Sequence, residues 1–209
     1  MNNKDGYFQF ILAIDCETTG LTFNTADCSI NDQAISWGLV VAKTNDLKPI
    51  DELYLEIKWN EQSKAKRRED PSFGRKAETI HGLTYEYLEE NGIDEITAAH
   101  KINQLLTKYW GPNNIVRTLG HNVHMFDLPF LRGTLVRGGV ERNFGNRHYD
   151  TNSAGFIALM TWTSNELFEM MGFDARNTHK AIDDAKMALE SARRLRLLFQ
   201  THCLNENSE

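Results

Sequence analysis

The chain has 209 residues, of which 41% are hydrophobic and 25% are charged, and its formal net charge at pH 7 is −6. This length suits one hydrophobic core, and the composition excludes a disordered or collagen-like chain. No apolar run approaches the roughly 20 residues of a membrane-spanning helix, so we expect no membrane partner. The acidic charge argues against a protein that coats nucleic acid, but not against an enzyme that acts on it.

The cysteines and the N-terminus indicate where the protein works. The three cysteines are odd in number and irregularly spaced, which favours neither disulfides nor a zinc cluster: Cys16, Cys28 and Cys203. The first residues, MNNKDGYFQF, lack the long apolar stretch of a secretory signal. We therefore expect a cytoplasmic protein with one domain over residues 1–209, a core over about 8–200 and a short polar tail over 201–209.

Three apolar segments near the N-terminus predict strands. QFILAID, which ends at Asp15, is typical of a buried strand, and AISWGLVVA (Ala34–Ala42) of a second. LYLEIKW (Leu53–Trp59) predicts a third, because its apolar residues occupy every odd position. The connections are too short for the helical crossovers that parallel strands need, so we predict an antiparallel meander.

Apolar residues change to helical spacing after the third strand. They recur at that spacing from Ile93 to Tyr109, until GPNN breaks the pattern and the short strand IVRTLG follows. Asp127, with Pro129 behind it, is typical of the start of another helix. The sequence RHYDT predicts one more short strand, which ends at Asp150.

Two further helices are predicted near the C-terminus. Thr163 and Glu166 have the spacing of a capping box, which predicts a helix that stops at Gly172. From Ala181 onward, apolar residues form one stripe at alternating spacings of four and three, which predicts a helix ending near Gln200. Together these elements predict an α/β fold in which helices flank a mixed sheet.

Two acids, Asp15 and Glu17, stand at the end of the first strand. Residues two apart in a strand point to the same side, so the two carboxylates are neighbours and repel each other. A cation between them relieves that repulsion, and oxygen ligands without nearby sulfur or imidazole favour Mg²⁺ or Mn²⁺. Taken alone, the stretch fits the beginning of a solvated turn equally well.

Two other segments carry acids at the start of predicted helices. Asp127, in LGHNVHMFDLPFL, suits a helix N-cap, because Asp followed closely by Pro is common there. Asp183 and Asp184, in THKAIDDA, suit the helix dipole in a first turn, and a single histidine such as His179 before a helix is usually structural. Each segment alone therefore has an ordinary structural explanation.

In combination, the three segments resemble the motifs of the DEDDh subgroup of DnaQ-like 3′–5′ exonucleases. In order, that family has D-x-E at the end of the first strand, N-x₂₋₃-[F/Y]-D before a middle helix, and H-x₄-D entering the last helix. The matching residues are Asp15 and Glu17, then Asn122, Phe126 and Asp127, then His179 and Asp184. TTGL after Glu17 and the later IHGLT also look like this family. The resemblance implies a single-domain ribonuclease H-like α/β fold.

The resemblance also implies a two-metal site for phosphodiester hydrolysis, with two Mg²⁺ or Mn²⁺ ions roughly 3.5–4 Å apart. By this resemblance Asp15 would bridge both ions, Glu17 and Asp184 would complete the site of the nucleophile's metal, and Asp127 would support the second. His179 would be the general base, a role that suits an imidazole near neutral pH. The implied products are nucleoside 5′-monophosphates.

The implied substrate is nucleic acid with a free 3′ end, DNA or RNA, single-stranded or frayed. The resemblance implies substrate contacts from Thr18, Thr19, Leu21, His81, Asn122 and Phe126. Among these, His81 fits an ordinary turn about equally well. Alternatives are an oligoribonuclease-like enzyme on short RNA, and a catalytically idle relative that binds nucleic acid or a polymerase. A DNA polymerase or another replication or repair protein is a further candidate partner.

A basic run between Lys58 and Lys76 contrasts with the acidic charge of the chain. It holds seven lysines and arginines against three acids. Such runs are usually solvated surface loops. The alternative is that these cations guide the phosphates of an incoming strand toward the site.

Overall fold

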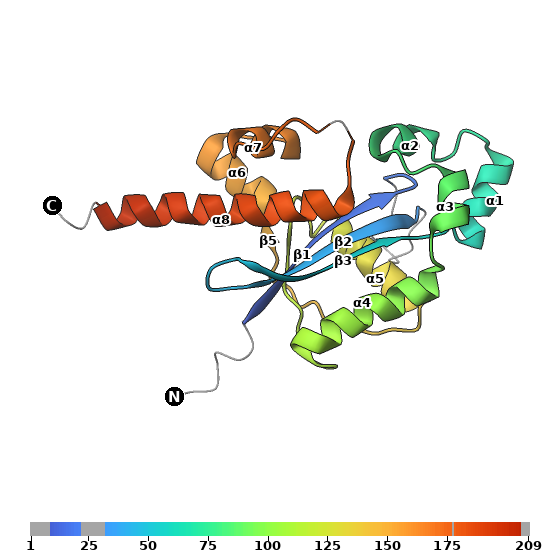
Figure 1. Ribbon diagram of the computed structural model, residues 1–209, viewed down its shortest axis with the longest axis horizontal. Coiled ribbons are helices and arrows are strands. Elements are labelled where there is room, and N and C mark those ends of the chain that lie inside the picture. The colour runs from blue at the N-terminus through green and yellow to red at the C-terminus, as the bar shows by residue number, and fades with distance from the viewer. Residues whose placement is uncertain (1–8, 22–31, 177, 206–209) are drawn as a thin grey trace.

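The computed structural model describes residues 9–21, 32–176 and 178–205, with side chains as far as Thr201 (Figure 1). Its five-stranded sheet has the order β3-β2-β1-β4-β5. The strands are β1 (Phe10–Thr18), β2 (Ala34–Lys43), β3 (Pro49–Glu56), β4 (Thr118–Gly120) and β5 (Tyr149–Asp150). The helices are α1 (Glu61–Glu69), α2 (Arg75–His81), α3 (Tyr85–Asn91), α4 (Glu95–Trp110), α5 (Asp127–Arg137), α6 (Thr151–Leu159), α7 (Ser164–Met170) and α8 (Ala181–Asn205).

The predicted meander is confirmed, because β2 pairs antiparallel with both β1 and β3, while β4 and β5 add parallel strands. The third strand differs from its predicted bounds: it begins at Pro49 and ends at Glu56. The apolar alternation continues past that end because Ile57 and Trp59 are also buried, and Trp59 packs with Ile35 and Leu88 outside the main sheet core. The alternating apolar residues therefore predicted correctly which side chains are buried, but the predicted length of the strand was wrong.

Alternating residues of β1 divide between two cores, one on each face of the sheet. Leu12 and Ile14 pack into the cluster that includes α4 and α5. Ile11 and Ala13 pack with residues of α7 and α8. These two helices lie on the other side of the sheet from α4 and α5 (Figure 1). Because side chains alternate along a strand, Asp15 and Glu17 belong to the α8 face.

The predicted helices are present, but some of their bounds and buried residues differ from the prediction. α4 begins at Glu95, after Ile93, and Ile96 of the predicted stripe is 58% exposed. The capping box of Thr163 and Glu166 is present at the start of α7. α8 runs on to Asn205, so the predicted tail over 201–209 is helical in its first part.

Four helices were not predicted from the sequence: α1, α2, α3 and α6. All are short, between seven and nine residues, so none shows an apolar stripe of several turns. The run from Lys58 to Lys76 is therefore mostly helical, in α1 and the start of α2. No helix within the described parts of the chain is both long and apolar enough to cross a membrane.

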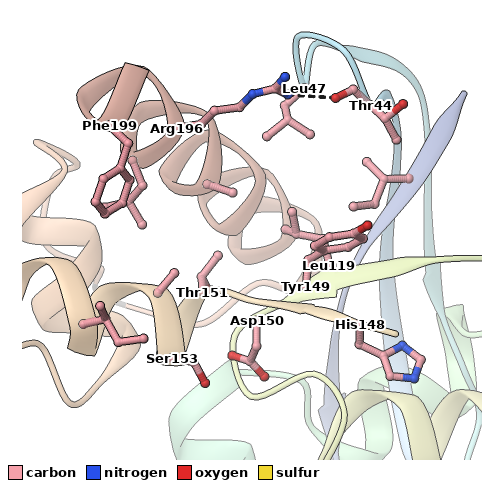
Figure 2. A pocket seen from close by; sticks show the side chains of 15 residues that line it. Thr44, Leu47, Leu119, His148, Tyr149, Asp150, Thr151, Ser153, Arg196 and Phe199 are labelled. Carbon is pink, nitrogen blue, oxygen red and sulfur yellow. Dashed lines mark hydrogen bonds between the residues drawn. The ribbon is translucent and has the colours of Figure 1, made fainter. Parts of the chain in front are cut away.

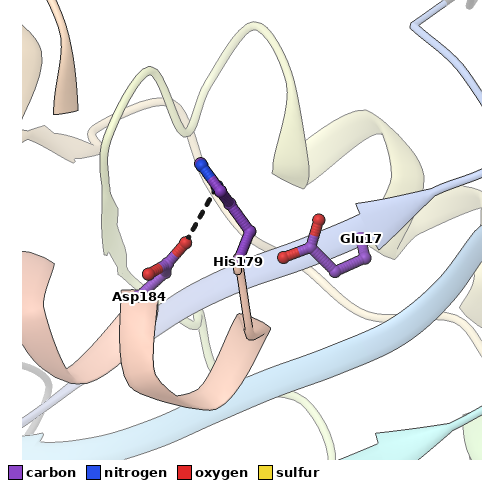
Figure 3. Close-up of side chains that lie close together, drawn as sticks. All are labelled: Glu17, His179 and Asp184. Atoms are coloured by element: carbon purple, nitrogen blue, oxygen red, sulfur yellow. Dashed lines mark ion pairs between the residues drawn. The ribbon is translucent and has the colours of Figure 1, made fainter. Parts of the chain in front are cut away.

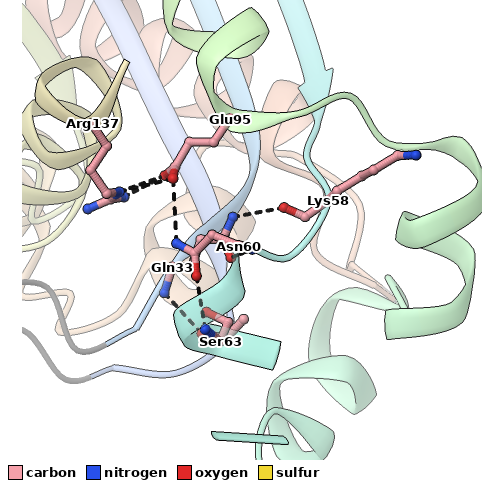
Figure 4. A network of polar contacts seen from close by, with 7 residues as sticks. Gln33, Lys58, Asn60, Ser63, Glu95 and Arg137 are labelled. Atoms are coloured by element: carbon pink, nitrogen blue, oxygen red, sulfur yellow. Dashed lines mark hydrogen bonds and ion pairs between the residues drawn. The ribbon is translucent and has the colours of Figure 1, made fainter. Parts of the chain in front are cut away.

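Polar contacts hold the start of α1 against the sheet (Figure 4). The Asn60 backbone N–H donates to Gln33 Oε1 at 2.7 Å, and Gln33 Nε2 donates to the Lys58 carbonyl at 2.9 Å. Asn60 Nδ2 also lies 3.5 Å from Glu95 Oε2, and Glu95 forms an ion pair with Arg137 of α5 at 2.6 Å. These contacts join the residue just before β2 to the start of α1, to α4 and to α5.

The first residue of α8 lies directly against β2 at Gly38. A Cβ on Gly38 would stand 2.2 Å from both the carbonyl carbon and the carbonyl oxygen of Ala181. Gly38 pairs with Asp15 in the β1–β2 ladder. The missing side chain therefore lets the backbone of α8 reach the sheet beside Asp15.

We expect Gly38→Ala to destabilise the protein by about 1–3 kcal/mol or more, because backbone atoms must move to admit the methyl group. The measurement is the free energy of unfolding in a denaturant titration. A variant as stable as the parent would contradict the close contact between β2 and α8.

Candidate active site

The end of β1 places two acids on the face that α8 covers. Asp15 is partly buried and Glu17 is 8% exposed. Glu17 Oε1 has no hydrogen-bond partner among the described residues. The solvated-turn explanation of this stretch is therefore not supported, because Glu17 is almost fully removed from water.

The start of α8 and the segment before it bring His179 and Asp184 to Glu17 (Figure 3). One potential metal-ligand atom from each of these three residues lies within 4.8 Å of the others. His179 Nδ1 stands 3.3 Å from Asp184 Oδ2. Asp184 is 3% exposed, whereas Asp183 points to solvent. The predicted register, in which Asp184 is the site residue, agrees with this burial.

Asp127 reaches the site from the first turn of α5. It is not the N-cap: Phe126 occupies that position and makes no side-chain cap. Instead, the Asp127 carboxylate is 2% exposed and its Oδ1 accepts the backbone N–H of Cys16 at 3.0 Å. Asp127 therefore links α5 to β1 between the two acids of the first motif.

Burial and mutual repulsion shift the acids toward their neutral forms. Burial, then the charges of Asp127, Asp184 and Glu17, raise the pKa of Asp15. Burial first, then the charge of Asp184, raise the pKa of Glu17 from 4.5 to about 7, although His179 opposes the shift. Burial also raises the pKa of Asp127. Without added positive charge, Asp15, Glu17 and Asp127 do not all ionise easily near neutral pH.

A cleft of about 380 Å³ opens beside these acids. It is lined by nine of the eleven predicted site residues, namely Asp15, Glu17, Thr18, Thr19, Leu21, His81, Phe126, Asp127 and His179. Asp184 is buried next to Glu17 and His179, outside the lining. Asn122 is also outside the lining.

The conformation of Asn122 explains its place in the second motif. Its φ is 60°, a left-handed conformation that asparagine tolerates better than most residues. Its backbone N–H donates to Asp150 Oδ1 at 2.9 Å, and its carbonyl accepts the N–H of Phe126 at 3.1 Å. Asn122 thus shapes the turn that presents Phe126 and Asp127.

His81 lines the cleft as a neutral imidazole. It is 6% exposed, and burial lowers its pKa to about 4. Its Nδ1 accepts the N–H of Leu83 at 3.0 Å, which leaves the ring proton on Nε2. The side chain can therefore act as a hydrogen-bond donor.

The sequence patterns did not single out two residues of the site. His121 lines the cleft, where its ring nitrogens lie 3.2 Å from Thr151 Oγ1 and from Asn152 Nδ2. Arg176 forms an ion pair with Asp184 at 2.5 Å. His121 lies in the segment of the second motif. No sequence pattern marks Arg176, because its contact with Asp184 depends on how the chain runs between α7 and α8.

Some residues of the basic run make contacts within the protein, and one lines the cleft. Lys64 forms an ion pair with Glu89 at 2.8 Å, and Arg67 pairs with Glu78 at 3.3 Å while its guanidinium lies over the Trp59 ring. Lys76 lines the cleft. Part of the run thus stabilises α1 to α3, and guidance of a strand by the remainder stays a prediction.

A second cavity, of about 580 Å³, lies away from the acids between α6, the later part of α8 and the edge of the sheet (Figure 2). Leu47, Leu119, Ile157 and Phe199 are among its largely apolar lining. Arg196 closes one side by donating to the Thr44 carbonyl at 2.8 Å. None of the four motif acids lines this cavity.

Comparisons with known proteins agree with this geometry. A family model described as exonuclease, RNase T, matches residues 12–191. E. coli exonuclease I in its zinc-bound complex with single-stranded DNA is similar with a TM-score of 0.68 and 19% identity, over 93% of this chain and 43% of that chain. The structure of the same enzyme with a dA16 oligonucleotide has a TM-score of 0.67 and 19% identity, over the same shares of the two chains.

A 3′-exonuclease, in a structure of 3′-end-specific recognition of a histone mRNA stem-loop, gives a TM-score of 0.64 and 14% identity over 91% of this chain and 83% of that chain. This chain spans less than half the length of the exonuclease I chains that it resembles. No curated protein sequence matches it significantly. The family match and the structural likeness confirm the predicted ribonuclease H-like fold.

The raised pKa of Glu17 predicts a pH dependence of stability in the metal-free protein. Between pH 4.5 and about 7 the folded state keeps a proton that the unfolded chain has lost, so stability falls as pH rises through this window. The loss is at most about 3 kcal/mol. Thermal melts in EDTA across the window should show this decline, and Glu17→Gln should reduce it. Identical pH slopes in parent and variant would contradict the assignment.

Proposed function

The chain belongs to the exonuclease family whose model covers residues 12–191, and from this membership we propose that it is a divalent-metal-dependent 3′–5′ exonuclease releasing nucleoside 5′-monophosphates. One observation carries the proposal: Glu17, His179 and Asp184 bring potential ligand atoms within 4.8 Å of one another. Asp15 and Asp127 border the same cleft. Four acids and one histidine are the set that the family motifs require.

The residues present fit a divalent cation. Glu17 Oε1 and Asp184 Oδ1 are buried and have no hydrogen-bond partner within the described part of the chain. Buried carboxylates of like charge call for positive charge, and oxygen ligands suit Mg²⁺ or Mn²⁺. We propose two ions, one held by Asp15, Glu17 and Asp184 and the other by Asp15 and Asp127. When bound, such a pair would activate the attacking water and stabilise the leaving oxygen.

His179 is the proposed general base. Its Nδ1 faces Asp184 Oδ2, so a proton on Nδ1 points to the carboxylate and Nε2 remains free to accept a proton. The side chain is 35% exposed, which keeps it within reach of a water in the cleft. His179 would therefore take the proton of the attacking water.

The cleft suits the 3′ end of an unpaired strand. Leu21 is 77% exposed and Phe126 is half-buried, so both offer apolar surface to the terminal bases. The backbone at Thr18 and Thr19 would contact the terminal nucleotide, and His81 Nε2 would donate to its sugar or phosphate. Asn122 would contribute by holding the turn before Phe126.

Both DNA and RNA fit the proposal, because one similar structure holds a DNA oligonucleotide and another concerns a histone mRNA stem-loop. Activity on short RNA, a polymerase partner and a cytoplasmic location stay predictions. A catalytically idle relative is disfavoured, because a protein that only binds has no use for four neighbouring acids that repel one another.

The proposed activity predicts that a 5′-labelled single strand shortens in single-nucleotide steps with Mg²⁺ or Mn²⁺ and stays intact in EDTA. Single-stranded DNA, single-stranded RNA and duplex are compared in parallel, with a circular single strand as the control that lacks a 3′ end. Undiminished cleavage in EDTA, or internal cuts in the circle, would overturn the proposal.

Asp184 and its neighbour Asp183 provide a matched pair. Asp184→Asn removes a buried ligand and should lower kcat by about two or more orders of magnitude. Asp183→Asn changes an exposed acid in the same turn and should leave kcat nearly unchanged. Equal losses in the two variants would mean that the assignment of Asp184 is wrong.

A further inference from the structure

Arg176, between α7 and α8, is held on several sides. Its side chain is only 9% exposed, and its Nη1 lies 2.5 Å from Asp184 Oδ2. Two further contacts come from the start of α7, where Ser164 Oγ lies 3.0 Å from Nη2 and Asn165 Oδ1 lies 3.1 Å from Nε. The guanidinium also lies 4.9 Å from the centre of the Phe168 ring. These contacts leave the guanidinium little freedom to move away from Asp184.

The two oxygens of Asp184 have different surroundings. Oδ2 pairs with Arg176 and faces His179 Nδ1. Oδ1 is buried and has no hydrogen-bond partner in the described residues. A carboxylate held by one oxygen cannot rotate freely, so the other oxygen keeps a fixed direction. Arg176 therefore fixes the orientation of the Asp184 carboxylate and leaves its Oδ1 without a partner among the described residues.

Arg176 also supplies charge to the whole cluster. An arginine keeps its positive charge at physiological pH, unlike a histidine. Its charge opposes the upward pKa shifts of Asp15 and Glu17. In the metal-free protein, Arg176 thus offsets part of the repulsion among the carboxylates.

Building on the proposed exonuclease site, we propose that Arg176 is a positioning residue with two effects. It neutralises Asp184 while the site holds no metal, and it fixes the orientation of the carboxylate that an incoming divalent cation binds. Because α7 holds the guanidinium in place, its charge also repels the bound ion. Arg176 therefore stabilises the metal-free site and weakens metal binding.

The test compares the parent protein with Arg176→Gln in EDTA and in saturating Mn²⁺, at alkaline pH so that protons compete little with the metal. The variant should lose several degrees of Tm in EDTA and much less in Mn²⁺, since the metal supplies the missing charge. Its Kd for Mn²⁺, measured by calorimetry, should be lower by about threefold or more, because one repulsive charge is gone. Arg176→Lys, which keeps the charge, should restore most of the Tm in EDTA.

Arg194→Gln is a matched control. Arg194 also joins α8 to α7: it pairs with Glu190 at 2.8 Å, donates to the Met171 carbonyl and lies over the Phe173 ring. No interaction joins it to the four motif acids within the described structure. This variant should lose the same Tm in EDTA as in Mn²⁺, and its Kd for Mn²⁺ should not change.

An equal Tm loss for Arg176→Gln in both buffers with an unchanged Kd would overturn the proposal and reduce Arg176 to a packing role. If this variant folds in neither buffer, Arg176→Lys decides: parent-like Tm in EDTA supports the charge role, and failure to fold overturns it. All these readouts are independent of turnover. A parent that binds Mn²⁺ but leaves a 5′-labelled strand intact would therefore overturn the proposed exonuclease and not the role of Arg176.

Discussion

The close contact between the backbones of α8 and β2 is the constraint on which the site depends. Gly38 has no side chain, so Ala181 can lie against the sheet where a Cβ would stand 2.2 Å from its carbonyl. Gly38 is also the ladder partner of Asp15. His179 and Asp184, on either side of Ala181, are thereby brought to the end of β1. A wider gap between helix and sheet would separate the acids of the first and third motifs.

The four acids repel one another electrostatically because they lie close together, and the rest of the site must offset this repulsion. Glu17, Asp127 and Asp184 are each less than one-tenth exposed, so water screens their charges poorly. Each comes from a different element, and packing on both faces of the sheet keeps these elements in place. Rigid elements can hold like charges together in a way that a mobile loop cannot, and such a cluster favours cations.

The geometry of a strand explains why some residues of β1 fill the core while others form the site. Residues at even positions fill the core with α4 and α5, and residues at odd positions face α8. The same alternation that buries Leu12 and Ile14 therefore places Asp15 and Glu17 on the opposite face. Asp127 completes the site from α5 because it hydrogen-bonds the backbone at Cys16, between these two acids.

The sequence by itself determined the meander and the main helices, and it singled out the four acids as candidates, because strand alternation, helical periodicity and motif spacing are local properties of the chain. It also distinguished Asp184 from Asp183 through motif register, in agreement with the burial of Asp184. It did not reveal the short helices α1, α2, α3 and α6, which are too brief for a periodic signal. Only the tertiary structure decided that Asp127 bonds β1 instead of capping α5, and that Arg176 pairs with Asp184. Both contacts join residues from different segments of the chain, and the distance between such residues depends on how the helices pack on the sheet.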